Sequence, residues 1–363
     1  MDVYKIVITG GPCGGKSTAM SRIQKEFDKK GYKVLFVPET ASELISGGVA
    51  PWTCGTNSDF QKLQFSLQLY KEEIFRKAGS TMGAEKLLIV CDRGALDNKA
   101  YMSKEEYAGV LEYLGMSEVQ LRDNYDAVFH LVTAAKGAEG FYTTENNPAR
   151  TETAVQAAEI DDKLISAWTG HPHLRVIDNS TDFEGKMQRL IAEIASFLGE
   201  PEPLEIERKF LIEYPDTEML EAMPNCTSVD IIQTYLRSED DEEVRVRQRG
   251  KEGSFVYYLT QKRTINSMKR VEIERRLTQE EYLSLLMDAD TTRRQIRKTR
   301  YCLTMNNLYY EIDVYPFWKD KAIAEIELND EKTEVIFPDF IKVIKEVTDD
   351  PEYKNASLAK LEY

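Results

Sequence analysis

Residues 3–18 read VYKIVITGGPCGGKST. In this stretch an apolar run, residues 3–8, leads into a glycine-rich turn and then into an amphipathic segment, residues 17–30. Residues 10–18 fit the pattern G-x-x-x-x-G-K-[ST], in which backbone N–H groups and the N-terminus of a following helix surround phosphate oxygens. A nearly continuous apolar run before the loop, as here and at residues 87–90, is typical of a strand in a parallel sheet that is covered on both faces. The stretch therefore predicts a nucleotide-binding α/β domain.

Each residue type in this loop has a separate task. Glycines let the chain turn its N–H groups inward, Lys16 would neutralise charge on the β- and γ-phosphates, and the Ser17 hydroxyl would complete the shell of a Mg²⁺ ion. ATP or GTP is therefore expected to contact Gly10, Gly11, Gly14, Gly15, Lys16, Ser17 and Thr18. The preferred nucleobase is left open.

A P-loop also needs a carboxylate near the metal ion, and Asp92 is the candidate because it follows the apolar strand at residues 87–91. Ligands of doubly wound sheets bind at the carboxyl ends of the strands. We expect Asp92 to bind Mg²⁺ or its water shell, or to act as general base on an acceptor hydroxyl; capping of a helix is the alternative. Glu39 ends the second strand and is equally compatible with substrate contact and with capping.

Arg150 follows a loop rich in Gly, Thr and Asn. A mobile lid that brings an arginine to the transferring phosphate is the functional interpretation, and a surface salt bridge with Glu152 is the alternative. His171 and His173 are separated by a proline, so they are interpreted as a turn and not as metal ligands.

Composition narrows the class of protein. The 363 residues suit two domains, and the formal net charge of −15 disfavours unspecific binding to nucleic acid. No apolar run approaches the roughly 20 residues of a membrane span, and no signal peptide is evident. Five scattered cysteines without a C-x-x-C pair indicate reduced thiols. We expect a cytoplasmic protein, with peripheral membrane association as an open alternative.

The sequence pattern changes at residues 199–203 (GEPEP), so we expect domains at 1–200 and 204–363. The first domain alternates strands and helices, as a doubly wound α/β domain does. The second shows period-two alternation in eight segments, which predicts an α+β domain with an eight-stranded antiparallel tunnel barrel. The predicted strands are residues 205–212, 231–237, 244–249, 256–262, 269–277, 296–305, 308–314 and 322–328.

Charged residues recur at alternate positions in these strands, beginning with Glu205, Glu207 and Lys209. Residues i, i+2 and i+4 share one face of a strand, and their neighbours on the other face are mostly apolar. By the same alternation, two charged residues share a face in each of five further strands: Arg245 and Arg247, Glu272 and Glu274, Lys298 and Arg300, Glu311 and Asp313, and Glu325 and Glu327. Lys262 lies on the fourth strand. One charged strand is usually a solvated face. Acidic and basic residues on seven strands instead favour a lumen where a divalent metal joins carboxylates to phosphate.

The first half resembles the P-loop kinase-like family of the ribosylnicotinamide-kinase type, often classed with AAA-type ATPases. The resemblance runs from Ile6 to about Gly199 and rests on the loop and on residues 37–41, 92–101, 149–152 and 177–180. It implies ATP or GTP binding and is compatible with kinase or NTPase chemistry.

The second half, from Glu205 to about Tyr363, closely resembles the CYTH family, the triphosphate tunnel metalloenzymes, whose Glu-x-Glu-x-Lys motif is intact. The resemblance implies that Mg²⁺ or Mn²⁺ is bound by Glu205, Glu207, Glu325 and Glu327. It implies that triphosphate is held by Lys209, Arg245, Arg247, Lys262, Lys298 and Arg300. One metal would orient the substrate and another would activate water. Arg263 occupies a position where bacterial members of this family commonly have glycine. The size of the substrate that fits beside Arg263 at the rim of the tunnel is therefore left open.

The pairing of the two halves resembles a eukaryotic architecture that includes the insect translocation-defect protein family. The leading hypothesis is a metal-dependent triphosphatase that hydrolyses inorganic triphosphate, or an organic or nucleoside triphosphate, and binds a nucleotide in its P-loop domain. A GTP- or ATP-switched trafficking regulator that binds a phosphoinositide headgroup is the second. Adenylate cyclase-like activity in the barrel is the third. Four paired carboxylates favour the enzyme, because an anion-binding module gains nothing from them.

Overall fold

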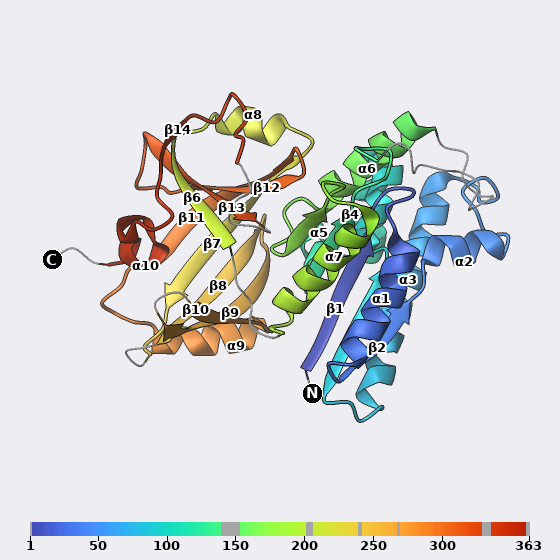
Figure 1. Cartoon of the computed structure of the whole chain (residues 1–363), viewed down its shortest axis with the longest axis horizontal. Coiled ribbons are helices and arrows are strands. Elements are labelled where there is room, and N and C mark those ends of the chain that lie inside the picture. Colours follow the sequence, from blue (N-terminus) through green and yellow to red (C-terminus); the bar gives the residue numbers. More distant parts are fainter. Residues whose placement is uncertain are drawn as a thin grey trace. The chain divides into compact units, whose positions relative to one another are not determined.

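The computed structural model describes residues 2–138, 153–200, 206–238, 242–266, 269–328 and 335–360 (Figure 1). Contacts divide the chain into two compact units, Met1–Glu193 and Ile194–Tyr363. This division falls within helix α7 (Phe183–Phe197). The predicted boundary at residues 199–203 stays a prediction, since the segment contains undescribed residues. Each unit is described by itself below.

The first unit is built on a five-stranded parallel sheet with the strand order β2-β3-β1-β4-β5. The strands are β1 (Asp2–Thr9), β2 (Tyr32–Val37), β3 (Lys86–Asp92), β4 (Ala127–Leu131) and β5 (Leu174–Ile177). Their apolar side chains are fully buried at the centre, as the continuous apolar runs predicted. The parallel α/β sheet of the sequence prediction is confirmed.

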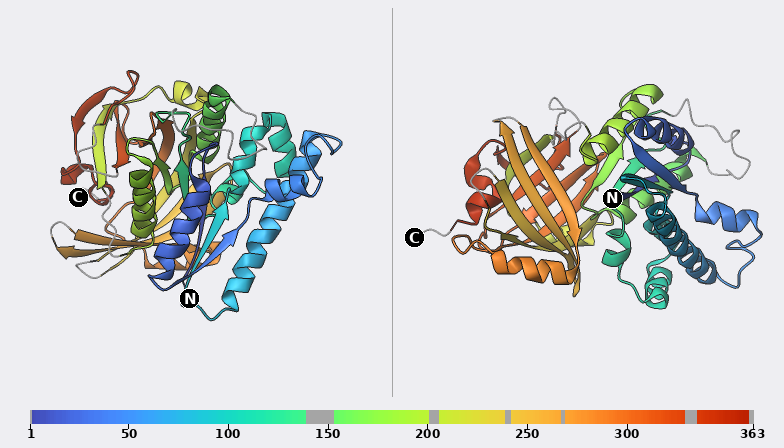
Figure 2. Two further views of the ribbon diagram at one scale, coloured as in Figure 1. Left: turned by 45° about the vertical axis from the view of Figure 1, so that its right-hand side comes forward. Right: turned by 90° about the horizontal axis from the view of Figure 1, so that it is seen from below.

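Helices cover both faces of this sheet, with α1 and α7 on one side and α3 on the other (Figure 2). The helices are α1 (Lys16–Asp28), α2 (Thr40–Ser46), α3 (Asn57–Ser80), η1 (Ala95–Tyr101), α4 (Lys104–Leu114), α5 (Glu118–Arg122), α6 (Ala154–Trp168) and α7. Local sequence signals begin several of them: the Ser103 hydroxyl accepts from the N–H of Glu106 at the start of α4, and Thr153 accepts from Gln156 at the start of α6.

The second unit contains a nine-stranded antiparallel sheet with the order β10-β9-β8-β7-β11-β12-β13-β6-β14. Its strands are β6 (Ile206–Glu213), β7 (Cys226–Tyr235), β8 (Glu242–Lys251), β9 (Ser254–Asn266), β10 (Lys269–Leu277), β11 (Ile296–Met305), β12 (Leu308–Val314), β13 (Lys321–Leu328) and β14 (Val343–Glu346). The eight predicted strands are found. The ninth, β14, was not predicted because its four residues are all exposed and carry no hydrophobic alternation. Within the described ranges no pairing joins β10 to β14, so closure into a barrel stays a prediction.

The outer face of this sheet is apolar and is covered by short helices. Leu220 of α8 (Thr217–Ala222) packs with Ile312 and Ala324, and Tyr282 of α9 (Gln279–Leu285) packs with Val246. This arrangement leaves the charged residues of the same strands on the opposite, inner face, because side chains alternate along a strand. The remaining short elements are η3 (Leu286–Asp288), η4 (Pro351–Tyr353) and α10 (Asn355–Leu358).

Candidate phosphate sites

The loop between β1 and α1 requires glycine for steric reasons. Gly10 has φ +138°, and a Cβ atom there would lie 2.1 Å from the carbonyl oxygen of Leu131. Gly15 has φ +99° and immediately precedes α1. Both conformations are disfavoured for residues with a side chain. The glycines recognised in the motif therefore allow the loop to curl closely over the end of β4.

Lys16 lies back across this loop. Its Nζ donates to the carbonyl of Gly10 at 3.0 Å and to that of Gly11 at 3.5 Å. Burial, with the nearby Arg93, lowers the pKa of Lys16 to about 8. An ammonium group held over the mouth of the loop is suited to contact the terminal phosphates of a nucleotide.

Asp161 of α6 is a further residue at this loop that the sequence analysis missed. Its fully buried carboxylate accepts from the backbone N–H of Gly11 at 2.9 Å and from that of Thr133 at 3.1 Å. Burial opposes ionisation, but His130 and Lys136 hold the pKa of Asp161 below its usual range. Asp161 therefore ties α6 to the P-loop. No signal in the sequence distinguishes it from other acidic residues on helices.

Asp92 ends β3 and Glu39 follows β2, so both lie at the same edge of the parallel sheet as Lys16, as the sequence predicted. Asp92 Oδ1 is buried and has no hydrogen-bond partner among the described residues, and burial raises the pKa of Asp92. Asp92 does not cap η1, whose N-cap is Gly94. The predicted role of Asp92 at Mg²⁺ or at an acceptor hydroxyl stays a prediction.

Arg93 is the second residue here that the sequence analysis did not assign. It has φ +66°, an uncommon conformation for a residue with a side chain, and its Nε donates to Glu39 Oε1 at 2.6 Å. Backbone strain of this kind is often found at functional sites. Glu39 is therefore engaged by Arg93 and by the Ser42 hydroxyl, and its side chain does not cap α2. Arg150 lies outside the described residues.

In the second unit, strand register gathers the predicted charges. Glu327 lies opposite Glu207, and Glu325 lies opposite Lys209 on one side and Glu311 on the other. Lys209 Nζ is 2.6 Å from Glu325 Oε1. Burial and the charge of Glu325 raise the pKa of Glu207. Glu205, the first residue of the motif, lies outside the described residues.

Arg300 is the centre of an ion-pair cluster, which we call the Arg300 cluster and which consists of Lys298, Arg300, Glu311, Asp313 and Glu325. Its Nε and Nη2 donate to the two oxygens of Asp313 at 2.6 and 2.7 Å, and Nη2 also donates to Glu325 at 2.7 Å. Arg300 further pairs with Glu311, and Lys298 pairs with Asp313. Asp313 is fully buried, so it orients both cations. Its role was not assigned from the sequence.

The remaining predicted phosphate ligands lie on neighbouring strands of the same face. Arg245 of β8 is opposite Thr260 of β9, and Lys262 follows two residues later on that strand. Arg247 Nη1 lies 3.7 Å from Glu274 Oε2. The side chain of Glu272 lies outside what the structure describes, as does that of Arg263. The described candidates therefore lie on one face of the sheet and come from five strands, β6, β8, β9, β11 and β13.

One end of this charged face is closed by apolar side chains. Leu211, Tyr315 and Ile323 continue the faces of Lys209, Asp313 and Glu325, and they pack together with Ala359 after α10. The Tyr315 hydroxyl donates to Asn355 Oδ1 at 2.8 Å, which attaches the C-terminal segment to the same end. The charges are thus confined to part of the inner face, and the rest of it is a hydrophobic core.

The donor set of this face fits a hard divalent cation, because such ions prefer carboxylate oxygens. Burial first and the charge of Glu325 second raise the pKa of Glu207, and a cation between these two carboxylates would offset their repulsion. Within the described ranges no three His, Cys, Asp or Glu side chains are grouped closely enough to hold a metal.

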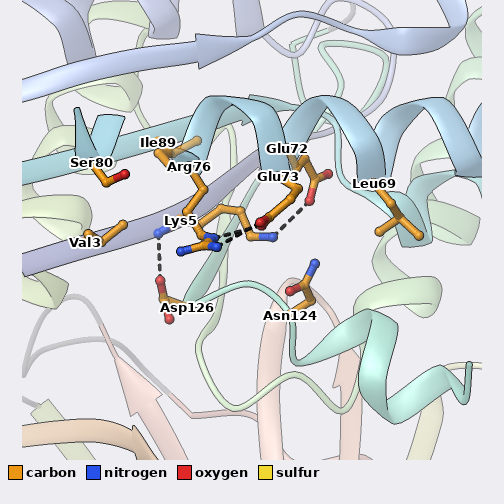
Figure 3. Close-up of a pocket in the computed structure, with 10 residues that line it drawn as sticks. All are labelled: Val3, Lys5, Leu69, Glu72, Glu73, Arg76, Ser80, Ile89, Asn124 and Asp126. Carbon is orange, nitrogen blue, oxygen red and sulfur yellow. Dashed lines mark hydrogen bonds and ion pairs between the residues drawn. The ribbon is translucent and has the colours of Figure 1, made fainter. Parts of the chain in front are cut away.

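A separate cavity of about 300 Å³ lies beneath α3 in the first unit (Figure 3). Lys5 crosses it, with its Nζ 2.9 Å from Glu72 Oε2 and its backbone N–H 2.6 Å from Asp126 Oδ2. Arg76 is paired with Glu73 on the cavity wall. None of the residues predicted for the two phosphate sites lines it. Its charges are paired with one another, so it is not assigned to phosphate.

Comparison with known proteins finds relatives of two kinds. A family model described as an AAA domain matches residues 5–186, half of the chain. The chain also matches an inorganic triphosphatase of Acetivibrio thermocellus, with 32% identity over 163 residues; the match covers 44% of this chain and 95% of that protein. The chain therefore belongs to the AAA domain family and to the family of this triphosphatase.

Solved structures give weaker likenesses. The crystal structure of the inorganic triphosphatase NE1496 is 30% identical, and the match covers 43% of this chain and 94% of that one with a TM-score of 0.30. A protein of Pyrococcus horikoshii, PH1012, is 17% identical and matches 36% of this chain and 82% of its own with a TM-score of 0.27. Within the described part of the chain no helix is long and apolar enough to cross a membrane.

Proposed function

We propose that the second unit is a metal-dependent triphosphatase that cleaves inorganic triphosphate, or a triphosphate-bearing molecule, into shorter phosphates with water. The observation that carries the proposal is the Arg300 cluster. Its cations and carboxylates lie side by side on one inner face, where a triphosphate and its metal ions would find both kinds of partner. The relative named an inorganic triphosphatase supports the same chemistry.

The cations would hold the substrate. Lys209 and Arg300 both form ion pairs with Glu325. When a phosphate chain binds here, phosphate oxygens would replace carboxylate oxygens as the partners of these two cations, so each cation would keep an anionic partner. Arg245, Arg247, Lys262 and Lys298 would bind the outer phosphates. Because Asp313 is buried against Lys298 and Arg300, it would keep both side chains extended toward the substrate.

The carboxylates would hold the metal. Glu207, Glu325 and Glu327, together with Glu205 of the same motif, are the proposed ligands of Mg²⁺ or Mn²⁺. A divalent ion bound there would offset the charge of the phosphate and lower the pKa of bound water. The oxygen of water would form a bond to the terminal phosphorus while the bridging P–O bond breaks. Pyrophosphate would be the leaving group, the terminal phosphorus would become orthophosphate, and a proton from the water would be released.

The first unit is proposed to bind ATP or GTP through residues 10–18, with Mg²⁺ near Ser17 and Asp92. The buried carboxylate of Asp92 at the edge of the sheet supports this assignment. Arg150 is proposed to reach the same phosphates. A kinase or NTPase reaction remains compatible with these residues. The comparisons lend no support to a phosphoinositide switch, a cyclase or a trafficking role.

The test is phosphate release from tripolyphosphate by the full chain with Mg²⁺ or Mn²⁺. The double variant Glu205→Ala/Glu207→Ala is expected to lose at least about a hundredfold in rate, since two proposed metal ligands are removed. Glu213→Ala, an exposed glutamate on the same strand, is the matched control and should behave as wild type. Lys16→Ala should also retain the activity. Full activity in the double variant, or its loss in Lys16→Ala alone, would place the reaction elsewhere.

A further inference from the structure

An exposed aromatic ring lies at the rim of the P-loop. A Cβ atom on Gly15 would lie 2.8 Å from Phe183 Cε2 and 3.3 Å from its Cζ, so the ring edge contacts the backbone at the start of α1. Phe183 is nevertheless 51% exposed. Single exposed apolar side chains are normal on protein surfaces. This one is unusual because it touches the loop that is proposed to hold a nucleotide.

The ring is fixed in place by the turn that carries it. Glu184, the next residue, forms a two-pronged ion pair with Arg22 of α1, and one of its bonds is 2.6 Å long. Met187 lies beneath with no exposed surface and also contacts Gly15. Lys186 donates to the carbonyl of Val132 at 2.6 Å. The first turn of α7 is therefore attached to both α1 and the end of β4, and the position of the ring is well defined.

Sheet topology decides which end of a bound nucleotide would meet this ring. In the order β2-β3-β1-β4-β5, the strand that carries the P-loop has β3 on one side and β4 and β5 on the other. The carboxylates that interact with Lys16 are Asp92, Glu39 and Asp97, and all three lie on the β2–β3 side together with Arg93. On the β4–β5 side Lys16 interacts with another cation, Lys186. The terminal phosphate and its metal belong on that side. The nucleoside then leaves the loop toward β4 and β5, and Phe183 follows β5.

We propose that Phe183 is the stacking surface for the nucleobase of the nucleotide bound by the P-loop, an inference that rests on the proposed nucleotide binding of the first unit. A partly exposed ring offers a face to a flat base, and stacking of this kind contributes to binding without hydrogen bonds to the base edge. Every base has such a face, so stacking is tolerant of base identity.

The polar groups of the segment between β5 and Phe183 already have partners. The Asn179 amide donates to the carbonyls of Thr133 at 2.8 Å and Lys136 at 2.7 Å, and its oxygen accepts from Lys186. Asp178 is paired with Arg189. These groups hold the loop after β5 together. The site is therefore expected to accept purine nucleotides by stacking and to discriminate little between ATP and GTP.

The test compares nucleotides with a ligand that has phosphates but no base. Binding of ATP, GTP and tripolyphosphate is measured by calorimetry on the full chain in the Glu205→Ala/Glu207→Ala background, which removes two proposed metal ligands of the second site. Only the part of the binding that is lost when Lys16→Ala is added to this background is assigned to the P-loop. Phe183→Ala should raise the Kd of both nucleotides about tenfold and leave the Kd of tripolyphosphate within twofold. Phe183→Trp should restore nucleotide binding to within threefold. Tyr113→Ala, which removes another exposed aromatic of the first unit, is the matched control and should change nothing.

The outcomes separate the two claims. An unchanged Kd for ATP in Phe183→Ala overturns the stacking role. An equal loss for ATP and tripolyphosphate also overturns it, because Phe183 would then act on the shape of the loop at Gly15. If the chain with Phe183 intact shows no nucleotide binding that Lys16→Ala weakens, the proposed nucleotide site itself fails, and the stacking role fails with it.

Discussion

The two candidate sites hold phosphate by different means. At the P-loop the groups that would surround phosphate are mostly backbone N–H groups, and glycines at 10 and 15 give them their direction. On the inner face of the second unit they are side chains from many strands, with Arg300 paired to three carboxylates. The P-loop site is formed by nine consecutive residues, 10–18. The site of the second unit exists only when strands far apart in the chain are in register.

The difference also affects how charge is neutralised. Backbone N–H groups carry only partial charges, so they can surround phosphate without burying a full charge. The P-loop therefore needs only one lysine, Lys16, and a few neighbouring side chains. The second site buries several full charges, each of which requires a partner. Removal of one side chain should therefore be more damaging in the second unit than in the first, whereas backbone changes should have the opposite effect.

The largest expected effect is on the second unit. Arg300→Ala removes the partner shared by Glu311, Asp313 and Glu325, and it leaves carboxylates in the interior with fewer compensating cations. Breaking a buried pair in this way costs about 3–5 kcal/mol. We expect triphosphatase activity to disappear and the free energy of unfolding, measured with urea, to fall by that amount. Arg275→Ala, which removes an exposed partner of Glu281, should cost less than about 1 kcal/mol. Similar losses of stability in both variants would show that the buried ion pairs of the Arg300 cluster contribute no more than an exposed pair does.

The next effect concerns backbone conformation. Gly10→Ala would place a Cβ atom 2.1 Å from the carbonyl of Leu131 at a φ of +138°. We expect nucleotide binding to be lost and stability to fall by about 2 kcal/mol or more, while triphosphatase activity persists. Gly109→Ala in α4 has open space around it and should stabilise the chain slightly, by about 0.5–1 kcal/mol. Nucleotide affinity is measured by calorimetry. Unchanged affinity in Gly10→Ala would contradict this prediction, because the loop could then move away from the Leu131 carbonyl and accept a Cβ atom.

The smallest effect is a pH dependence confined to the first unit. His171 is buried; its Nε2 lies 3.0 Å from the carbonyl of Tyr125, and its Nδ1 accepts from the N–H of His173. Burial lowers the pKa of His171 to about 3, so below the unfolded value near 6.5 the unfolded chain binds more protons. Between pH 6 and pH 5 the stability should therefore fall by about 1.4 kcal/mol.

The measurement is urea unfolding followed by the fluorescence of Trp168, whose ring centroid lies 6.1 Å from that of His171. Trp52→Phe and Trp318→Phe remove the other tryptophans. His171→Gln should lose most of the slope between pH 6.5 and 5. An unchanged slope in that variant would assign the acid sensitivity to other groups. The histidine pair is thus expected to have a structural role, in agreement with its interpretation as a turn.

Prediction from the sequence succeeded where a local pattern controls local structure. The eight period-two segments became β6 to β13 because alternation matches the pleat of a strand. β14 carries no such pattern and is ordered by pairing with β6. Asp161 and Asp313 were not assigned because their importance comes from what surrounds them: a glycine N–H 150 positions earlier in one case, and two cations of an adjacent strand in the other.

By itself the sequence determined that this protein has a P-loop and a strand-rich half with charges on one face, since both depend on residue type and spacing over short distances. Only the tertiary structure decided which groups meet. It paired Arg300 with three carboxylates, put Asp161 beneath the P-loop and set Phe183 against Gly15. The reason is physical: hydrogen bonds, ion pairs and ring contacts act over a few ångströms, and strand register and helix packing bring together residues that lie far apart in the chain.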